Sequence, residues 1–141
     1  MPLPRILIVD DEENMRFTLS EILKHEECLI DTADNGFKAL EKIRQVPFDV
    51  IILDLKMPKM DGMETLLQIR EISPNSVVLM VTAHGNREKA YQALNAGAYD
   101  FFNKPFDINE LRVVVRRAIE KSRLTRELEA LQRPELSFSN L

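Results

Sequence analysis

The sequence predicts an α/β fold: a doubly wound, five-stranded parallel sheet with helices on both faces and an extended C-terminal helix. Two observations predict this class. Short β-rich runs alternate five times with segments of helical spacing, and such alternation is typical of a parallel sheet with right-handed crossovers. Several of the runs are also apolar throughout, as strands are when both faces of a sheet are covered.

Five runs have the composition of strands. Three of them are continuously apolar and suit the centre of the sheet. In chain order the runs are RILIV (5–9), LIDTA (29–33), DVIIL (49–53), SVVLMV (76–81) and AYDFF (98–102). Periodicity alone does not fix the strand order, but for five strands the flavodoxin-like order 2-1-3-4-5 is the leading candidate.

Each run is followed by a segment in which apolar residues recur at helical spacing. The fourth segment is closed by Gly97 as a C-terminal cap, and in the last segment Asp107 and Glu110 fit a capping box. The apolar stripes of the first four segments are Met15, Leu19, Ile22 and Leu23; Phe37, Leu40 and Ile43; Met63, Leu66, Leu67 and Ile69; and Ala90, Ala93 and Leu94.

The last helical segment continues past the point where packing against the sheet should end. It contains no Gly or Pro before Pro134. We therefore divide the chain into a domain at 1–121, a linker helix at 122–133 and an irregular tail at 134–141.

Three leucines of the linker helix, Leu124, Leu128 and Leu131, keep a 4-3 spacing. Exposed in a row, they would form an apolar seam that a second copy could bury as a short coiled coil. The alternative is a solvated linker helix whose leucines pack on a further domain.

Composition excludes several classes of function. The net charge of −4 gives no overall attraction to nucleic acid or membranes, and the single cysteine, Cys28, cannot form an internal disulfide. The apolar runs are too short to cross a bilayer, and the N-terminal sequence turns acidic too early for a secretory signal. We expect a cytoplasmic protein.

Polar side chains follow the predicted strands. Asp10 and Asp11 follow the first strand, Asp54 the third, Thr82 the fourth and Lys104 the fifth. In the order 2-1-3-4-5 the first and third strands are neighbours at the reversal, where ligands bind in doubly wound sheets. Each residue alone could simply cap a strand or a helix. Their coincidence at successive strand ends indicates a site.

Three clustered carboxylates repel one another, so they must take up protons or a cation. Oxygen ligands at an open rim suit Mg²⁺, which accepts carboxylates together with a phosphate. Lys104 adds a positive charge and Thr82 a hydroxyl donor. The combination favours phosphoryl chemistry, and a carboxylate can form an aspartyl phosphate.

Particular residues exclude other classes of phosphate-binding protein. The four glycines at 36, 62, 85 and 97 are scattered, so neither a Walker loop nor a dinucleotide-binding loop is present. A phosphatase of the haloacid dehalogenase type would need an aspartate two residues after Asp54, where this chain has Lys56.

Four segments, ILIVDDEE, DVIILDLKMPKMDG, VVLMVTAHG and DFFNKPF, resemble the receiver domain of bacterial two-component response regulators. The resemblance covers about residues 4–122. It implies that Asp54 accepts a phosphoryl group from a histidine kinase. It further implies that Mg²⁺ is bound directly by Asp11 and Asp54, largely through water by Asp10, and by the backbone carbonyl of Lys56.

The same resemblance implies roles around the phosphoryl group. Lys104 pairs with that group, Thr82 moves to bond it on activation, and the Lys104–Pro105 peptide is cis. Phe101 stands where the family has its switch aromatic, often tyrosine. Because phenylalanine has no hydroxyl, a switch at Phe101 would have to act through packing, and the alternative is a static core residue.

A narrower resemblance involves TAHGN, NAGAYDFFNKPF and the long helix entering ELEALQ, which are similar to receivers of the nitrogen-regulation type. These belong to σ54-dependent transcription activators, whose AAA+ ATPase domain often begins with a phrase like the closing FSNL. The expected partners are a sensor kinase, a second copy, and AAA+ and DNA-binding output domains, with no direct nucleic-acid contact here.

Two alternatives stay open: a stand-alone receiver that regulates a separate protein, and a Mg²⁺-dependent acyl-phosphate phosphatase. The leading interpretation is a regulatory domain rather than an enzyme.

Overall fold

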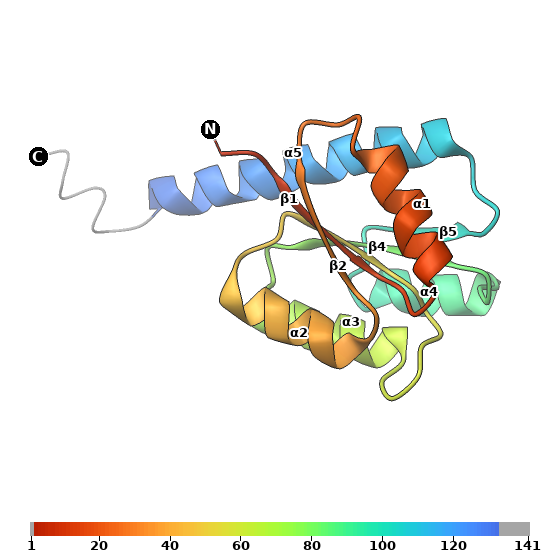
Figure 1. Cartoon of the computed structure of the whole chain (residues 1–141). Coiled ribbons are helices and arrows are strands. Elements are labelled where there is room, and N and C mark those ends of the chain that lie inside the picture. Colours follow the sequence, from red (N-terminus) through yellow and green to blue (C-terminus); the bar gives the residue numbers. More distant parts are fainter. Residues whose placement is uncertain (1, 133–141) are drawn as a thin grey trace, which may run out of the picture.

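The computed structural model describes residues 2–132 and has a single parallel sheet at its centre (Figure 1). The strand order β2-β1-β3-β4-β5 confirms the predicted doubly wound topology. The strand bounds lie within about two residues of the predicted runs, as is usual for such assignments. The strands are β1 Arg5–Val9, β2 Leu29–Ala33, β3 Val50–Leu53, β4 Val77–Thr82 and β5 Asp100–Asn103.

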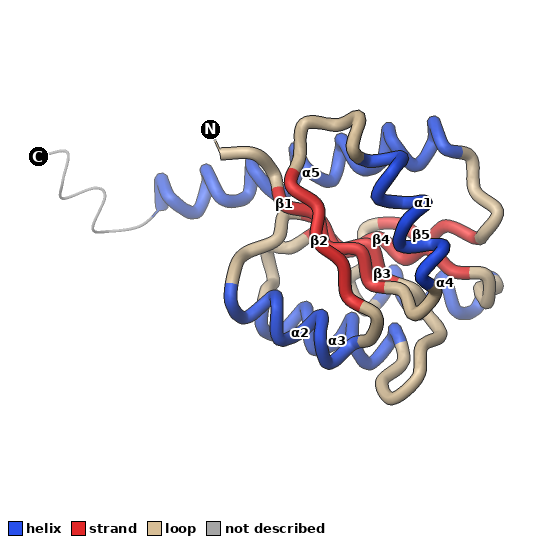
Figure 2. Tube along the Cα trace, viewed as in Figure 1, coloured by secondary structure: helices blue, strands red, loops and turns tan. Residues whose placement is uncertain are grey.

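Helices cover both faces of the sheet (Figure 2). Two helices, α1 (Glu13–Leu23) and α5 (Ile108–Gln132), lie on one face. The other three, α2 (Gly36–Gln45), α3 (Gly62–Ile72) and α4 (Arg87–Asn95), lie on the opposite face. Each layer has its own apolar core, and the residues of β1, β3 and β4 alternate between the two. This explains why these three strands are apolar throughout.

Three side chains of the predicted apolar stripes do not reach a core. Phe37 is 55% exposed, Leu67 is 57% exposed and Leu94 is 46% exposed. Each directly follows a buried residue of its helix, and one residue turns a helix by about 100°. The buried residues of α2 lie on its inner side, which leaves Phe37 on its outer side.

The helix ends follow the expected capping chemistry. The Asp107 carboxylate accepts a hydrogen bond of 2.9 Å from the backbone N–H of Glu110, which is the N-cap half of the predicted capping box. Gly97 follows α4 with a φ of +107°, the left-handed conformation that favours glycine at a helix C-terminus.

α5 is much longer than the sheet requires. Its 25 residues correspond to about 37 Å of helix, and its distal part extends beyond the body of the domain (Figure 1). Leu124, Leu128 and Leu131 are 58%, 51% and 77% exposed. The tail at 134–141 lies outside the described residues. Between residues 2 and 132, no helix combines the length and apolarity that crossing a bilayer requires.

Candidate functional site

The candidate site lies at the carboxyl edge of the sheet, where β1 and β3 are neighbours. Asp10 directly follows β1 and Asp54 directly follows β3. The backbone N–H of Asp54 donates to the Val9 carbonyl at 2.9 Å, and that of Asp10 donates to the Ala33 carbonyl at 3.1 Å. The sheet ladder therefore fixes the backbone beneath both carboxylates.

Three carboxylates converge there: oxygens of Asp10, Glu12 and Asp54 all lie within 4.8 Å of one another. The ammonium group of Lys104 lies 2.8 Å from Oδ2 of Asp10 and 3.8 Å from Oδ2 of Asp54. Asp10, Asp54 and Lys104 are nearly closed to solvent, with side chains 2%, 3% and 9% exposed. Two buried carboxylates thus share one buried cation.

The β4 and β5 ends complete the site. Thr82, the last residue of β4, is completely buried, and its hydroxyl accepts the His84 backbone N–H at 3.1 Å. The Lys104 backbone N–H donates to the Thr82 carbonyl at 2.8 Å, and the Lys104–Pro105 peptide is cis. Residues from four different strand ends are therefore held around one point.

Asp54 has an unusual electrostatic environment. Burial raises the pKa of its carboxyl, and the nearby negative charge of Asp10 acts in the same direction, while Thr82 and Lys104 oppose the shift. Its Oδ1 atom is buried and has no hydrogen-bond partner among residues 2–132. A buried anionic oxygen without a partner is costly. An all-oxygen donor set with such an atom fits a hard cation such as Mg²⁺.

Asp11 and the Lys56 carbonyl stay predicted metal ligands. The Asp11 side chain is exposed and stands outside the carboxylate cluster; the Lys56 side chain is exposed too, but the predicted ligand there is the backbone carbonyl. Glu12 takes the third position, and its backbone N–H donates to Oδ1 of Asp10 at 2.9 Å. Sequence reasoning missed Glu12. The signal was the acidic run that continues past Asp11.

A tight loop carries the chain from Asp54 into α3. The backbone N–H of Gly62 donates to the Leu55 carbonyl at 2.6 Å, which closes the loop. A Cβ atom on Gly62 would lie 2.2 Å from the Asp54 carbonyl oxygen. Lys59 sits in the loop with a φ of 71°, an uncommon conformation for a residue other than glycine.

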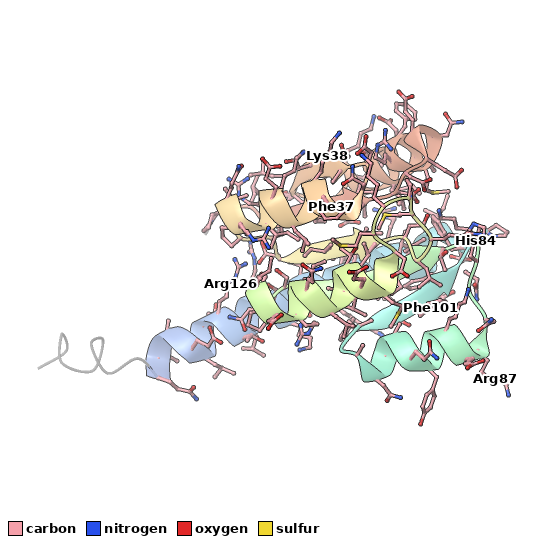
Figure 3. All side chains as sticks on the ribbon, turned by 90° about the horizontal axis from the view of Figure 1, so that it is seen from below. Phe37, Lys38, His84, Arg87, Phe101 and Arg126 are labelled. Atoms are coloured by element: carbon pink, nitrogen blue, oxygen red, sulfur yellow. The ribbon has the colours of Figure 1, made fainter. Side chains whose placement is uncertain are left out.

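Phe101 on β5 is half-buried and packs against the core under α2, α3 and α4. A Cβ atom on Gly85 would lie 2.5 Å from the Phe101 ring, so the β4–α4 loop rests directly on this aromatic side chain. His84 in the same loop is exposed, at the edge of the molecule in Figure 3.

The doubly wound sheet, with buried aspartates, a lysine and a threonine at its switch point, defines the class of α/β signalling domains. Sequence comparison is more specific: residues 6–116 match the response regulator receiver domain. This chain belongs to the response regulator receiver domain family.

Three similar proteins illustrate the range of the family. The regulatory protein AtoC of Escherichia coli is 38% identical over 127 residues, which are 90% of this chain but 28% of AtoC. Sporulation initiation phosphotransferase F of Bacillus subtilis is 37% identical over 113 residues, 80% of this chain and 91% of that protein. The beryllofluoride-activated NtrC4 receiver domain dimer is 41% identical with a TM-score of 0.79, covering 84% of this chain and 98% of that one. The chain spans little more than a quarter of the length of AtoC.

Proposed function

We propose that this chain is a phosphorylation-activated switch in which Asp54 accepts a phosphoryl group from a histidine kinase. One observation carries the proposal. At the switch point of the sheet, Oδ1 of Asp54 is buried and has no partner within the described part of the chain, while Oδ2 lies 3.8 Å from the Lys104 ammonium group. Such a group is both reactive and electrostatically prepared for an incoming anion.

The transfer is a displacement at phosphorus. An Asp54 carboxylate oxygen forms the new P–O bond, the P–N bond of the kinase phosphohistidine breaks, and its electron pair leaves with the imidazole nitrogen. Lys104, now paired with Asp10, can turn its charge toward the phosphoryl oxygens, and the Thr82 hydroxyl can donate to one of them.

Mg²⁺ is the proposed cofactor, held by Asp10, Asp11, Asp54 and the Lys56 carbonyl. When bound, it neutralises negative charge where the phosphoryl group meets the carboxylates. Asp11 is exposed, so its side chain must turn inward to reach such an ion. Glu12 already stands within the cluster, and this makes it the competing ligand.

Incubation with acetyl phosphate and Mg²⁺ tests the phosphoacceptor. The protein should gain the mass of one phosphoryl group, and Asp54→Asn should gain none. Asp11→Asn and Glu12→Gln, titrated with Mg²⁺ in parallel, identify the ligand: the larger loss of affinity marks the residue that binds the metal. Undiminished phosphorylation of Asp54→Asn would refute the assignment.

The proposed output is a σ54-dependent AAA+ transcription activator with a DNA-binding domain, in a cytoplasmic protein. Two observations support this output: α5 is long, and the chain is similar to about a quarter of the length of the regulatory protein AtoC. The chain also covers most of sporulation initiation phosphotransferase F. A receiver that acts on a separate protein is therefore the second candidate. An independent acyl-phosphate phosphatase is the least supported, since Lys56 occupies the position of its second aspartate.

Dimerisation through α5 is part of the proposal. Leu124, Leu128 and Leu131 are exposed along the distal part of the helix, and the related NtrC4 receiver is described as a dimer. A seam of about one heptad gives only weak association by itself. Sedimentation equilibrium should show a dimer that weakens when all three leucines become serine. A strictly monomeric wild type at about 100 µM, well above micromolar dissociation constants, would contradict it.

A further inference from the structure

A second buried carboxylate lies at the other end of β3. Asp49 directly precedes Val50, the first residue of the strand, and is 4% exposed. Its backbone N–H donates to the Arg5 carbonyl at 2.8 Å, and its carbonyl accepts the Val77 N–H at 2.9 Å. The residue is therefore fixed in the sheet between β1 and β4.

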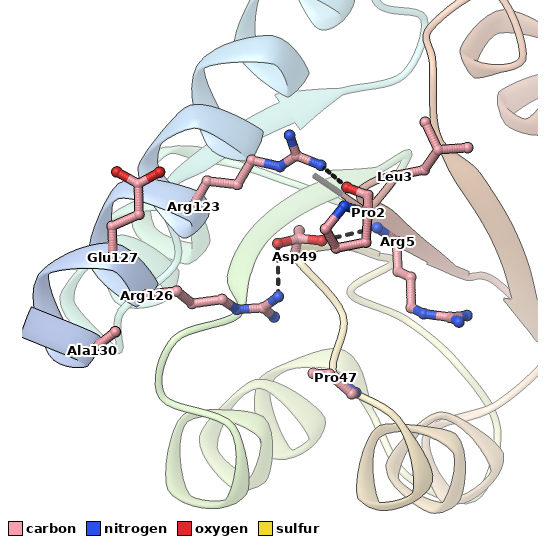
Figure 4. Close-up of a pocket in the computed structure, with 9 residues that line it drawn as sticks. All are labelled: Pro2, Leu3, Arg5, Pro47, Asp49, Arg123, Arg126, Glu127 and Ala130. Carbon is pink, nitrogen blue, oxygen red and sulfur yellow. Dashed lines mark hydrogen bonds and ion pairs between the residues drawn. The ribbon is translucent and has the colours of Figure 1, made fainter. Parts of the chain in front are cut away.

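The Asp49 side chain has three donors. Oδ2 accepts the backbone N–H of Arg5 at 2.9 Å, and Oδ1 accepts the Ser122 hydroxyl at 3.0 Å. Oδ1 also lies 3.1 Å from a guanidinium nitrogen of Arg126 (Figure 4). Ser122 and Arg126 are one helical turn apart on α5, so this one carboxylate links the sheet to the part of the helix that begins at Ser122.

The distal part of α5 depends on such polar contacts. Ser122 is the last buried residue of the helix among those that the structure describes. Beyond it, the Glu129 carboxylate accepts the Asn75 side-chain amide at 2.7 Å, and the Arg123 guanidinium donates to the Pro2 carbonyl. The hydrogen bond of Glu129 is exposed to solvent, where a single contact contributes little. Asp49 is the only one of these acceptors that is buried.

We infer that Asp49 is a positioning residue that fixes the direction in which residues 122–132 leave the sheet. The clasp formed by Asp49, Ser122 and Arg126 makes this helix a rigid arm of the domain rather than a free linker. The importance of the arm rests on the proposed function, because a rigid arm would transmit a change in how two receivers pair. The clasp itself does not depend on phosphorylation.

The clasp can be opened without unfolding the sheet. Loss of the Arg126 side chain leaves Asp49 with the Arg5 N–H and the Ser122 hydroxyl, so the buried carboxylate keeps two donors. Arg126 is itself 38% exposed, so its replacement creates no cavity in the core. Arg126→Gln is therefore the mild variant, and Ser122→Ala/Arg126→Gln is the strong one.

Two measurements on the 141-residue chain test the clasp. Amide hydrogen exchange at residues 123–128 should accelerate about tenfold in Arg126→Gln, the factor expected from one lost hydrogen bond to a charged group. Exchange in β1, β3 and β4 should not change. Spin labels at Glu41→Cys on α2 and Gln132→Cys on α5, in a Cys28→Ser background, should give a narrow distance distribution that broadens in the double variant.

Arg117→Gln is the matched control, since Arg117 is an exposed arginine on the same helix, and it should match the wild type. Arg126→Lys keeps a cation within reach of Asp49 and should keep the distance distribution as narrow as in the wild type. The inference would be overturned if Arg126→Gln and Ser122→Ala/Arg126→Gln both showed the same amide exchange rates and the same distance distribution as Arg117→Gln. Phosphoryl uptake at Asp54, measured on the same samples, reports separately on the proposed function.

Discussion

Gly62→Ala places a methyl group against the backbone that carries the phosphoacceptor. The new Cβ would lie 2.2 Å from the Asp54 carbonyl oxygen, 2.6 Å from Leu55 Cα and 2.9 Å from the Leu55 carbonyl oxygen. Ordinary contacts are about 3.5 Å, so the two segments must separate by about 1 Å. All three neighbours are backbone atoms of a buried strand end, and none can turn away as a flexible side chain would.

The cost follows from that geometry. Overpacking a rigid site costs about 3 kcal/mol, which corresponds to a melting temperature lower by about 12 °C for a domain of this size. The displacement also moves Asp54 relative to Lys104. Because a misplacement of about 1 Å can slow a reaction about a hundredfold, phosphorylation should fall by a similar factor.

Thermal unfolding followed by circular dichroism and phosphoryl uptake from acetyl phosphate followed by mass spectrometry measure the two effects. Lys59→Gly is the control in the same loop. It relieves a positive φ without adding an atom, and should leave stability within about 1 kcal/mol of the wild type. A Gly62→Ala protein that melts like the wild type and is phosphorylated at the same rate would refute the steric argument.

Three further substitutions give separate tests. Hydrogen bonding to Arg116 lowers the pKa of Glu26, so the ionised carboxylate stabilises the folded protein. This contribution is complete above the ordinary carboxyl pKa and is lost as the pH falls through the lower folded-state pKa. Glu26→Gln should therefore lower the free energy of unfolding in urea by about 1 kcal/mol at pH 7 and by less toward pH 4. Lys104→Ala leaves two buried carboxylates without their cation, so the metal-free protein should lose about 3 kcal/mol and show a larger rise in melting temperature on adding Mg²⁺ than the wild type. Gly85→Ala should turn the Phe101 ring away from the β4–α4 loop, which a crystal structure of the variant would show; an unmoved ring would contradict the close packing.

The sequence predicts the doubly wound parallel sheet because the apolar runs and the helical stripes alternate without interruption, whereas the strand order rested on the common order for five strands. It was less informative about which side of a helix is buried. Phe37, Leu67 and Leu94 fitted their stripes yet are exposed, because the spacing of apolar residues does not show where the edge of the buried face lies. The acidic run after Asp10 also did not show that Glu12 is the residue that joins the carboxylate cluster, since this depends on how the chain turns after Asp10.

The segment DVIILD shows this limit most clearly, because it has an aspartate at each end of one apolar strand. In the sequence the two residues differ only in their place: Asp49 starts the strand, and Asp54 follows its carboxyl end, where ligands bind in doubly wound sheets. In the structure both are buried, at 4% and 3% exposed. Asp49 has three donors, whereas one oxygen of Asp54 has no partner among the residues that the structure describes. A carboxylate whose lone pairs are satisfied is held in place and unreactive, while one with a free lone pair beside a lysine can accept a cation or attack phosphorus. The difference in hydrogen bonding, which only the fold provides, separates the residue that positions α5 from the residue that we propose as the phosphoacceptor.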